Sequence, residues 1–131
     1  MILQEREARA CAIIDSMAKE LCDVSLYLHD NPELGLDEHK AVKVINQFLE
    51  THNFTSQVGL TDLPELQTAL RGDYNGTAQH KIAFLGEYDA LPELGHGCGH
   101  NLIAMMSLGA AIAFSQSAPE AWGTTFFGCP A

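Results

Sequence analysis

Apolar residues recur at steps of three and four along the first part of the chain. From residue 10 to residue 28 this spacing predicts one long amphipathic helix, carried by Ala10, Ile13, Ile14, Met17, Leu21, Val24 and Leu28. The helix should stop near residues 29–32, because the residue before Pro32 avoids the helical region. A second helix is predicted from Asp37, whose side chain can cap free backbone amides, to about Asn53.

The pattern then changes to that of strands. Residues 55–58 are a weak strand candidate, and the Asn-Gly pair at 75–76 predicts a hairpin turn. Residues 81–85 are apolar on both faces, as in a strand that is covered on both sides. Residues 102–115 predict a buried helix, and residues 124–127 predict a strand of the central type. This order of helices and strands predicts a layered α/β sheet.

The length and charge of the chain argue against several classes of function. The 131 residues correspond to about one domain, and the formal net charge is −10. That charge argues against binding to nucleic acid or anionic membranes, which need clustered Lys and Arg. No apolar stretch reaches the roughly 20 residues of a membrane span. The sequence shows no export signal and has four cysteines without CxxC spacing, so reduced thiols and a cytoplasmic location are expected.

Residues 87–101 contain most of the candidate chemistry. The candidate donors in this segment are Glu87, Asp89, His96, Cys98 and His100, which lie between a predicted strand and a predicted helix. The Cys98 thiolate and the His100 imidazole are separated by one residue, so both can turn toward one borderline metal ion such as zinc. Asp89 could accept the second ring N–H of a ligating histidine or bridge ions directly.

Other interpretations of this segment remain open. Many short His/Cys combinations bind nothing, and a structural zinc site is less favoured because such sites usually present four ligands. A redox role for Cys98 would need a resolving thiol, and none is adjacent. His29 is interpreted as a histidine that interacts with the dipole at its helix end. The chain has no GxSxG, P-loop, dinucleotide GxGxxG or HExxH motif.

Three segments carry a resemblance to a known family. Residues 29–35 read HDNPELG and are followed by Glu38, and residues 87–101 read EYDALPELGHGCGHN. Both segments, and the strand end FGCPA at 127–131, resemble metal-dependent amidohydrolases that include aminoacylases, hippurate hydrolases and aminobenzoyl-glutamate hydrolases. The central segment is most similar to the branch that holds dipeptidases similar to β-alanyl-lysine dipeptidase. The resemblance spans almost the whole chain.

The resemblance implies a fold and a site. The fold would be a three-layer α/β/α sheet like that of zinc exopeptidases, and residues 1–131 would be the N-terminal portion of the catalytic domain. Cys98 and His100 would be ligands in a site for two divalent ions, Zn or Mn, and Asp89 would be the catalytic acidic residue that supports them. Glu87 and His96 have no settled role. A general-base glutamate, further ligands and a lid and dimerisation domain would lie beyond Ala131.

The implied function is metal-dependent hydrolysis of an amide bond. The substrates would be N-acyl amino acids, aminobenzoyl-glutamate-like conjugates or dipeptides, and this chain would be an inactive fragment of the enzyme. The full-length parent is expected to be a homodimer, and the fragment is expected to self-associate. One alternative is a non-enzymatic short protein that binds metal or a partner, and a weaker one is a thiol-based sensor at Cys98.

Overall fold

The computed structural model describes residues 1–59 and 62–129, with the main chain alone at residue 129. The helices and strands in chain order are α1 (Leu3–Asp30), α2 (His39–Thr51), β1 (Thr55–Val58), β2 (Leu70–Tyr74), β3 (His80–Glu87), α3 (His100–Ser117) and β4 (Trp122–Cys129), and a single 3₁₀ turn, η1 (His96–Cys98), precedes α3. The predicted α/β class is therefore confirmed. The predicted end of the first helix is also confirmed, since α1 stops two residues before Pro32.

The four strands form one sheet in the order β1-β2-β4-β3. β4 runs antiparallel to β2 and parallel to β3, with a register from His80 opposite Trp122 to Glu87 opposite Cys129. The prediction of a central strand near residues 124–127 is confirmed, because β4 lies between two other strands. The carboxyl ends of β3 and β4 therefore meet at the same edge of the sheet.

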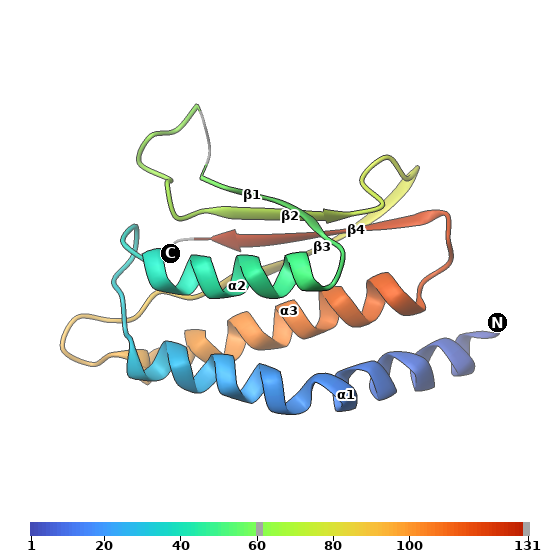
Figure 1. Ribbon diagram of the computed structural model, residues 1–131, viewed down its shortest axis with the longest axis horizontal. Helices are drawn as coiled ribbons and strands as arrows, with labels where there is room; N and C mark the ends of the chain where they lie inside the picture. Colours follow the sequence, from blue (N-terminus) through green and yellow to red (C-terminus); the bar gives the residue numbers. More distant parts are fainter. Residues whose placement is uncertain (60–61, 130–131) are drawn as a thin grey trace.

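All three helices lie on one side of the sheet, with α2 and α3 against the strands and α1 packed on α3 (Figure 1). Leu28, Ile45, Leu108, Ile112 and Phe126 are almost completely buried in the core between the sheet and the helices. Burial of such side chains is the main force that holds the layers together. The second helical layer of the expected three-layer fold is not found among residues 1–59 and 62–129.

Residues 81–85 are covered on one face only, so the prediction of a doubly covered strand is wrong for this chain. Phe84 packs toward α3 and its ring lies 5.9 Å from that of Phe114, whereas the neighbouring Leu85 is 62% exposed. β3 is an edge strand, and no described element covers the opposite face. An apolar strand without a second covering layer leaves every other side chain in water.

The Asn-Gly pair forms a turn but not a hairpin. Asn75 has a positive φ of 52°, and its carbonyl accepts a hydrogen bond from the amide of Ala78 at 3.0 Å. The two strands that flank the turn do not pair with each other, because β4 lies between them. The prediction of a turn is therefore confirmed, and the prediction that its flanking strands pair is wrong.

The cap of α2 also differs from the prediction. The helix begins at His39, and Asp37 does not cap it; its carboxylate lies 2.9 Å from Nε2 of His39. Glu33 caps the helix instead. Its carboxylate accepts hydrogen bonds from the amides of Lys40, at 2.9 Å, and Ala41, at 2.8 Å. A carboxylate at a helix N-terminus satisfies free amides and interacts favourably with the helix dipole.

Candidate metal centre

The candidate site lies at the carboxyl end of β3. The strand ends at Glu87, Asp89 follows in a buried loop position, and Cys98 is the last residue of η1. His100 is the first residue of α3. Ligands in open α/β sheets bind beyond the carboxyl ends of strands, so these side chains occupy the expected place.

Gly99 makes the tight connection between the two predicted ligands possible. Its φ is +84°, in the left-handed region that side chains other than glycine avoid, and its amide donates to the carbonyl of His96 at 3.0 Å. The chain therefore leaves η1 and enters α3 within one residue. This turn brings Cys98 and His100 to the same end of the helix.

His100 is flanked by two carboxylates. Oδ1 of Asp89 lies 2.7 Å from Nδ1 of His100, and Oε2 of Glu87 lies 3.0 Å from Nε2 on the other side of the ring. The side chains of His100 and Asp89 are mostly buried, while that of Glu87 is about half exposed. The buried Asp89 carboxylate at Nδ1 fixes the orientation of the imidazole. Nε2 faces the Glu87 carboxylate, so an ion bound by Nε2 would have to displace or share that contact.

Cys98 contacts the same aspartate through the backbone. Its sulfur lies 3.9 Å from the carbonyl oxygen of Asp89, and its side chain is half-buried. Asp89 thus touches both predicted metal ligands, His100 with its carboxylate and Cys98 with its carbonyl. Asp89 therefore connects the two ends of the segment 88–99, which is called the site loop below.

His96 is buried beside the site, and no described group hydrogen-bonds to its Nδ1. Burial lowers the pKa of His96 below that of a free histidine, and the charges of His29 and His100 act in the same direction. Asp89 and a hydrogen bond with the backbone of Leu28 oppose that shift without cancelling it. The environment of His96 therefore favours the neutral form of its imidazole.

The described residues do not by themselves form a complete metal site. Within residues 1–59 and 62–128, no three His, Cys, Asp or Glu side chains converge closely enough to hold an ion. The donor types still fit a divalent ion of the zinc class, because a thiol and an oriented imidazole are its preferred ligands. The assignments of Cys98 and His100 as ligands and of Asp89 as catalytic stay predictions.

Two contacts have no counterpart in the sequence analysis. The sequence assigns no role to Glu87, and its contact with His100 makes it a candidate donor. The segment at 33–34 lies beside the site loop, where the amide of Ala90 donates to the carbonyl of Glu33 at 2.6 Å and Leu34 forms a parallel bridge with Ala90. The resemblance joins these two segments in one family pattern, but nothing in their spacing predicts the contact.

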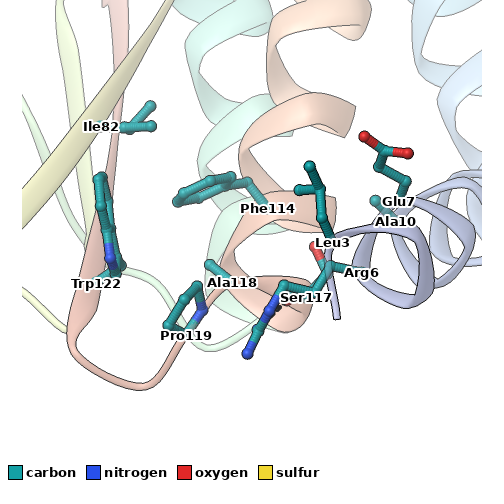
Figure 2. A pocket seen from close by; sticks show the side chains of 10 residues that line it. All are labelled: Leu3, Arg6, Glu7, Ala10, Ile82, Phe114, Ser117, Ala118, Pro119 and Trp122. Atoms are coloured by element: carbon teal, nitrogen blue, oxygen red, sulfur yellow. Dashed lines mark hydrogen bonds between the residues drawn. The ribbon is translucent and has the colours of Figure 1, made fainter. Parts of the chain in front are cut away.

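An apolar cavity lies at the other end of the sheet (Figure 2). It has a volume of about 460 Å³ and lies between the start of α1, the end of α3 and the amino ends of β3 and β4. Ile82, Phe114 and Trp122 line it, and Arg6 at its rim donates to the carbonyl of Ser117 at 2.8 Å. It holds no cluster of metal-ligating side chains, so the candidate chemistry stays at the carboxyl ends of the strands.

Comparisons with curated proteins give a consistent set of relatives. The chain is 34% identical over 140 residues to a Xaa-Arg dipeptidase of Mus musculus, covering 98% of this chain and 32% of that protein. It is 30% identical over 137 residues to one of the subunits of the p-aminobenzoyl-glutamate hydrolase of Escherichia coli, covering 89% of this chain and 28% of that protein. The chain thus spans about a third of the length of these relatives. No protein-family profile matches it.

Comparison of the fold with solved structures finds proteins of the same kinds. A Bacillus subtilis protein described as a dinuclear metal binding peptidase from the M20 family superposes with a TM-score of 0.74 at 25% identity, over 89% of this chain and 36% of that one. An aminobenzoyl-glutamate utilization protein from Klebsiella pneumoniae superposes with a TM-score of 0.71 at 14% identity, over 94% and 39% of the two chains. The predicted fold class and the resemblance to this family are confirmed.

Proposed function

The chain is a relative of the metal-dependent amidohydrolases and dipeptidases of the M20 family, and we propose that it supplies one wall of such an enzyme's metal centre. Cys98 and His100 would bind a divalent ion, and Asp89 would hold the His100 ring in place. The contact of Asp89 with His100 at 2.7 Å carries this proposal, because a carboxylate behind a histidine is the usual support of a metal ligand.

The proposed reaction is hydrolysis of an amide bond. A pair of Zn or Mn ions, when bound, supplies Lewis-acid polarisation of the amide carbonyl and a lowered pKa of water. The protein's own residues would orient this chemistry: Asp89 fixes His100, and Glu87 brings a second carboxylate to Nε2. N-acyl amino acids, aminobenzoyl-glutamate-like conjugates and dipeptides are the proposed substrates, since relatives are named for these classes.

The number of ligating side chains that converge limits the activity expected of this chain by itself. Because no three ligating side chains converge among the described residues, the remaining ligands and a general base must come from elsewhere in a complete enzyme. We therefore expect the 131-residue chain to bind metal weakly and to hydrolyse these substrates no faster than buffer. Metal-dependent turnover by this chain alone would contradict the proposal.

Metal content tests the ligands directly. The chain is dialysed to equilibrium against buffered zinc and analysed for zinc per chain in excess of the dialysis buffer, with Cys98→Ser and His100→Ala beside the unchanged protein. Cys11→Ser is the matched control, because Cys11 is an exposed thiol in the first half of α1, away from the part of α1 that contacts Asn101. Both site variants should lose the zinc that the control retains. Equal zinc in all four proteins would overturn the ligand assignment.

A second candidate function follows from the same donor count. A chain with an incomplete site and an uncovered sheet face could act as a non-enzymatic metal-binding or interaction protein. Mixing the chain with a longer relative that lacks the corresponding residues separates the two functions. Restored hydrolysis supports the enzyme proposal, and binding without hydrolysis supports the alternative.

The edge strand and the cysteines bear on assembly and location. The eight-residue edge strand β3 offers unpaired backbone groups, which favours self-association, and we propose a homodimer for the complete enzyme. The thiols of Cys11, Cys22 and Cys98 are all unpaired, which suits the reducing cytoplasm. No helix among the described residues is long and apolar enough to cross a membrane.

A further inference from the structure

A carboxyl group is buried at the start of α2 without serving that helix. Glu38 has 0% of its surface exposed, and the amides at the helix start are capped by Glu33 instead. One oxygen of Glu38, Oε2, accepts a hydrogen bond from the hydroxyl of Thr68 at 2.5 Å, and no described group hydrogen-bonds to Oε1. Burying a carboxyl group is costly, so a specific role for this one is expected.

Thr68 connects Glu38 to the candidate metal centre. It is also 0% exposed, and its carbonyl accepts a hydrogen bond from the hydroxyl of Tyr88. Tyr88 is 0% exposed as well, and its ring lies against the end of β4. A Cβ atom at Gly128 would be only 2.6 Å from Cε1 of that ring, so the absence of a side chain at Gly128 makes room for it.

Tyr88 stands between the two carboxylates of the site. Glu87 precedes it and Asp89 follows it, and these are the residues that contact the two nitrogens of His100. Tyr88 lies directly between Glu87 and Asp89 in the chain, so fixing its side chain restricts the backbone that carries both carboxylates. The tyrosine is held at its hydroxyl by Thr68 and along its ring by Gly128.

We propose that Glu38, Thr68 and Tyr88 form a positioning relay that aims the carboxylates of Glu87 and Asp89 at His100. The three residues come from the start of α2, the turn before β2 and the site loop, so the relay joins three segments that are distant in sequence. None of them is among the proposed metal ligands, so each would act through its neighbours in the relay. This inference rests on the proposed function, since it assigns these residues to the same metal centre.

A role in stability alone would give a different pattern of effects. Removing a buried hydrogen bond that only stabilises the fold speeds amide exchange throughout the core by the same factor. Removing a positioning contact loosens the site loop and leaves the rest protected. The amides of Ala90, Leu91 and Gly95 are hydrogen-bonded and report on the loop, and those within α1 report on the core.

The experiment compares Thr68→Val and Tyr88→Phe with the unchanged chain by amide hydrogen exchange. Thr68→Val removes the hydroxyl that binds Glu38, and Tyr88→Phe removes the hydroxyl that binds Thr68. Thr68→Ser keeps its hydroxyl, and Tyr74→Phe removes one from a tyrosine of β2 outside the relay. Tyr88→Phe should raise exchange of the loop amides about tenfold, as expected for roughly one lost buried hydrogen bond, with little change in α1. Thr68→Val also leaves the buried Glu38 carboxyl without its hydroxyl partner and so lowers global stability, and exchange of the loop amides should rise about tenfold more than that of the α1 amides.

Zinc affinity, measured by competition with a chelating dye, gives the second readout. Thr68→Val and Tyr88→Phe should weaken binding by about tenfold, which is the lower end of the effect of losing support behind a ligand. Thr68→Ser and Tyr74→Phe should bind like the unchanged chain. Exchange that rises equally in α1 and the loop, or unchanged zinc affinity in both relay variants, overturns the relay. If the unchanged chain binds no zinc, the proposed function fails, and the exchange pattern alone then decides the relay.

Discussion

Replacing Glu33 with alanine should destabilise the protein through the start of α2. The Glu33 carboxylate accepts hydrogen bonds from the amides of Lys40 and Ala41, and the helix has no side-chain cap of its own. Loss of a helix cap costs about 0.5–2 kcal/mol, and hydrogen bonds to a charged acceptor lie at the upper part of that range. We expect Glu33→Ala to lower the free energy of unfolding by about 2 kcal/mol.

Two further variants separate the effect of the Glu33 charge from the effect of where the capping carboxylate lies. Glu33→Gln keeps an acceptor oxygen but removes the charge that faces the helix dipole, so a loss of about 1 kcal/mol is expected. Asp37→Ala is the control, because Asp37 is the cap that the sequence predicts but its carboxylate is exposed and pairs with His39. An exposed ion pair of this kind contributes about 0–1 kcal/mol, so we expect a loss below about 0.5 kcal/mol.

Urea unfolding followed by far-ultraviolet circular dichroism measures these differences. The dependence of the free energy on urea should stay constant across the series, since the surface exposed on unfolding does not change. A loss for Asp37→Ala as large as that for Glu33→Ala would show that the capping argument is wrong. A loss below about 0.5 kcal/mol for Glu33→Ala would show the same.

The remaining predictions concern pH and the core. Burial alone would raise the pKa of Asp73, but hydrogen bonds from Arg71 and Thr125 outweigh it and hold that pKa below its usual value. The stabilisation of the folded protein by the Asp73 carboxylate is therefore complete above the unfolded pKa of roughly 3.9, and it is lost as the pH falls through the lower pKa of the folded state. At pH 7 the free energy of unfolding of Asp73→Asn should be about 1 kcal/mol lower than that of the unchanged chain. The two values should become equal in acid, as measured by urea titrations at several pH values. Leu108→Ala, at a fully buried position of α3, should cost about 3 kcal/mol, whereas Met106→Ala, 73% exposed on the same helix, should cost less than about 0.5 kcal/mol in the same assay. Similar losses for the two helix variants would contradict the described core.

The helices could be predicted because their signals are local. The apolar spacing that ends at Leu28 and the proline at 32 indicate the end of α1, and the apolar run from Leu102 locates α3. Pairing of strands depends on residues far apart in the chain, so the insertion of β4 beside Tyr74 has no local sign. The predicted cap of α2 is wrong for the same reason, since Glu33 reaches its amides from seven and eight positions away.

The site was predictable in its residue types and less so in its contacts. The spacing of Cys98 and His100 locates the candidate metal-binding loop, and Asp89 is expected beside a histidine ring, where the structure has it. The contact of Glu87 with the same ring depends on where β3 ends, which periodicity fixes only to within a few residues. The buried contact of Glu38 with Thr68 joins residues 30 positions apart, and no pattern in the sequence indicates it.

The place of β4 also constrains how this protein assembles during synthesis. α1, α2 and the pair of β1 with β2 precede the rest of the chain, so they can form while translation continues. β2 and β3 share no partner until residues 122–129 have left the ribosome, and the register of both is then set in one event. Such late, long-range closure slows folding, so the nascent chain exposes the unpaired edges of β2 and β3 until β4 arrives and should depend most on chaperones at that stage.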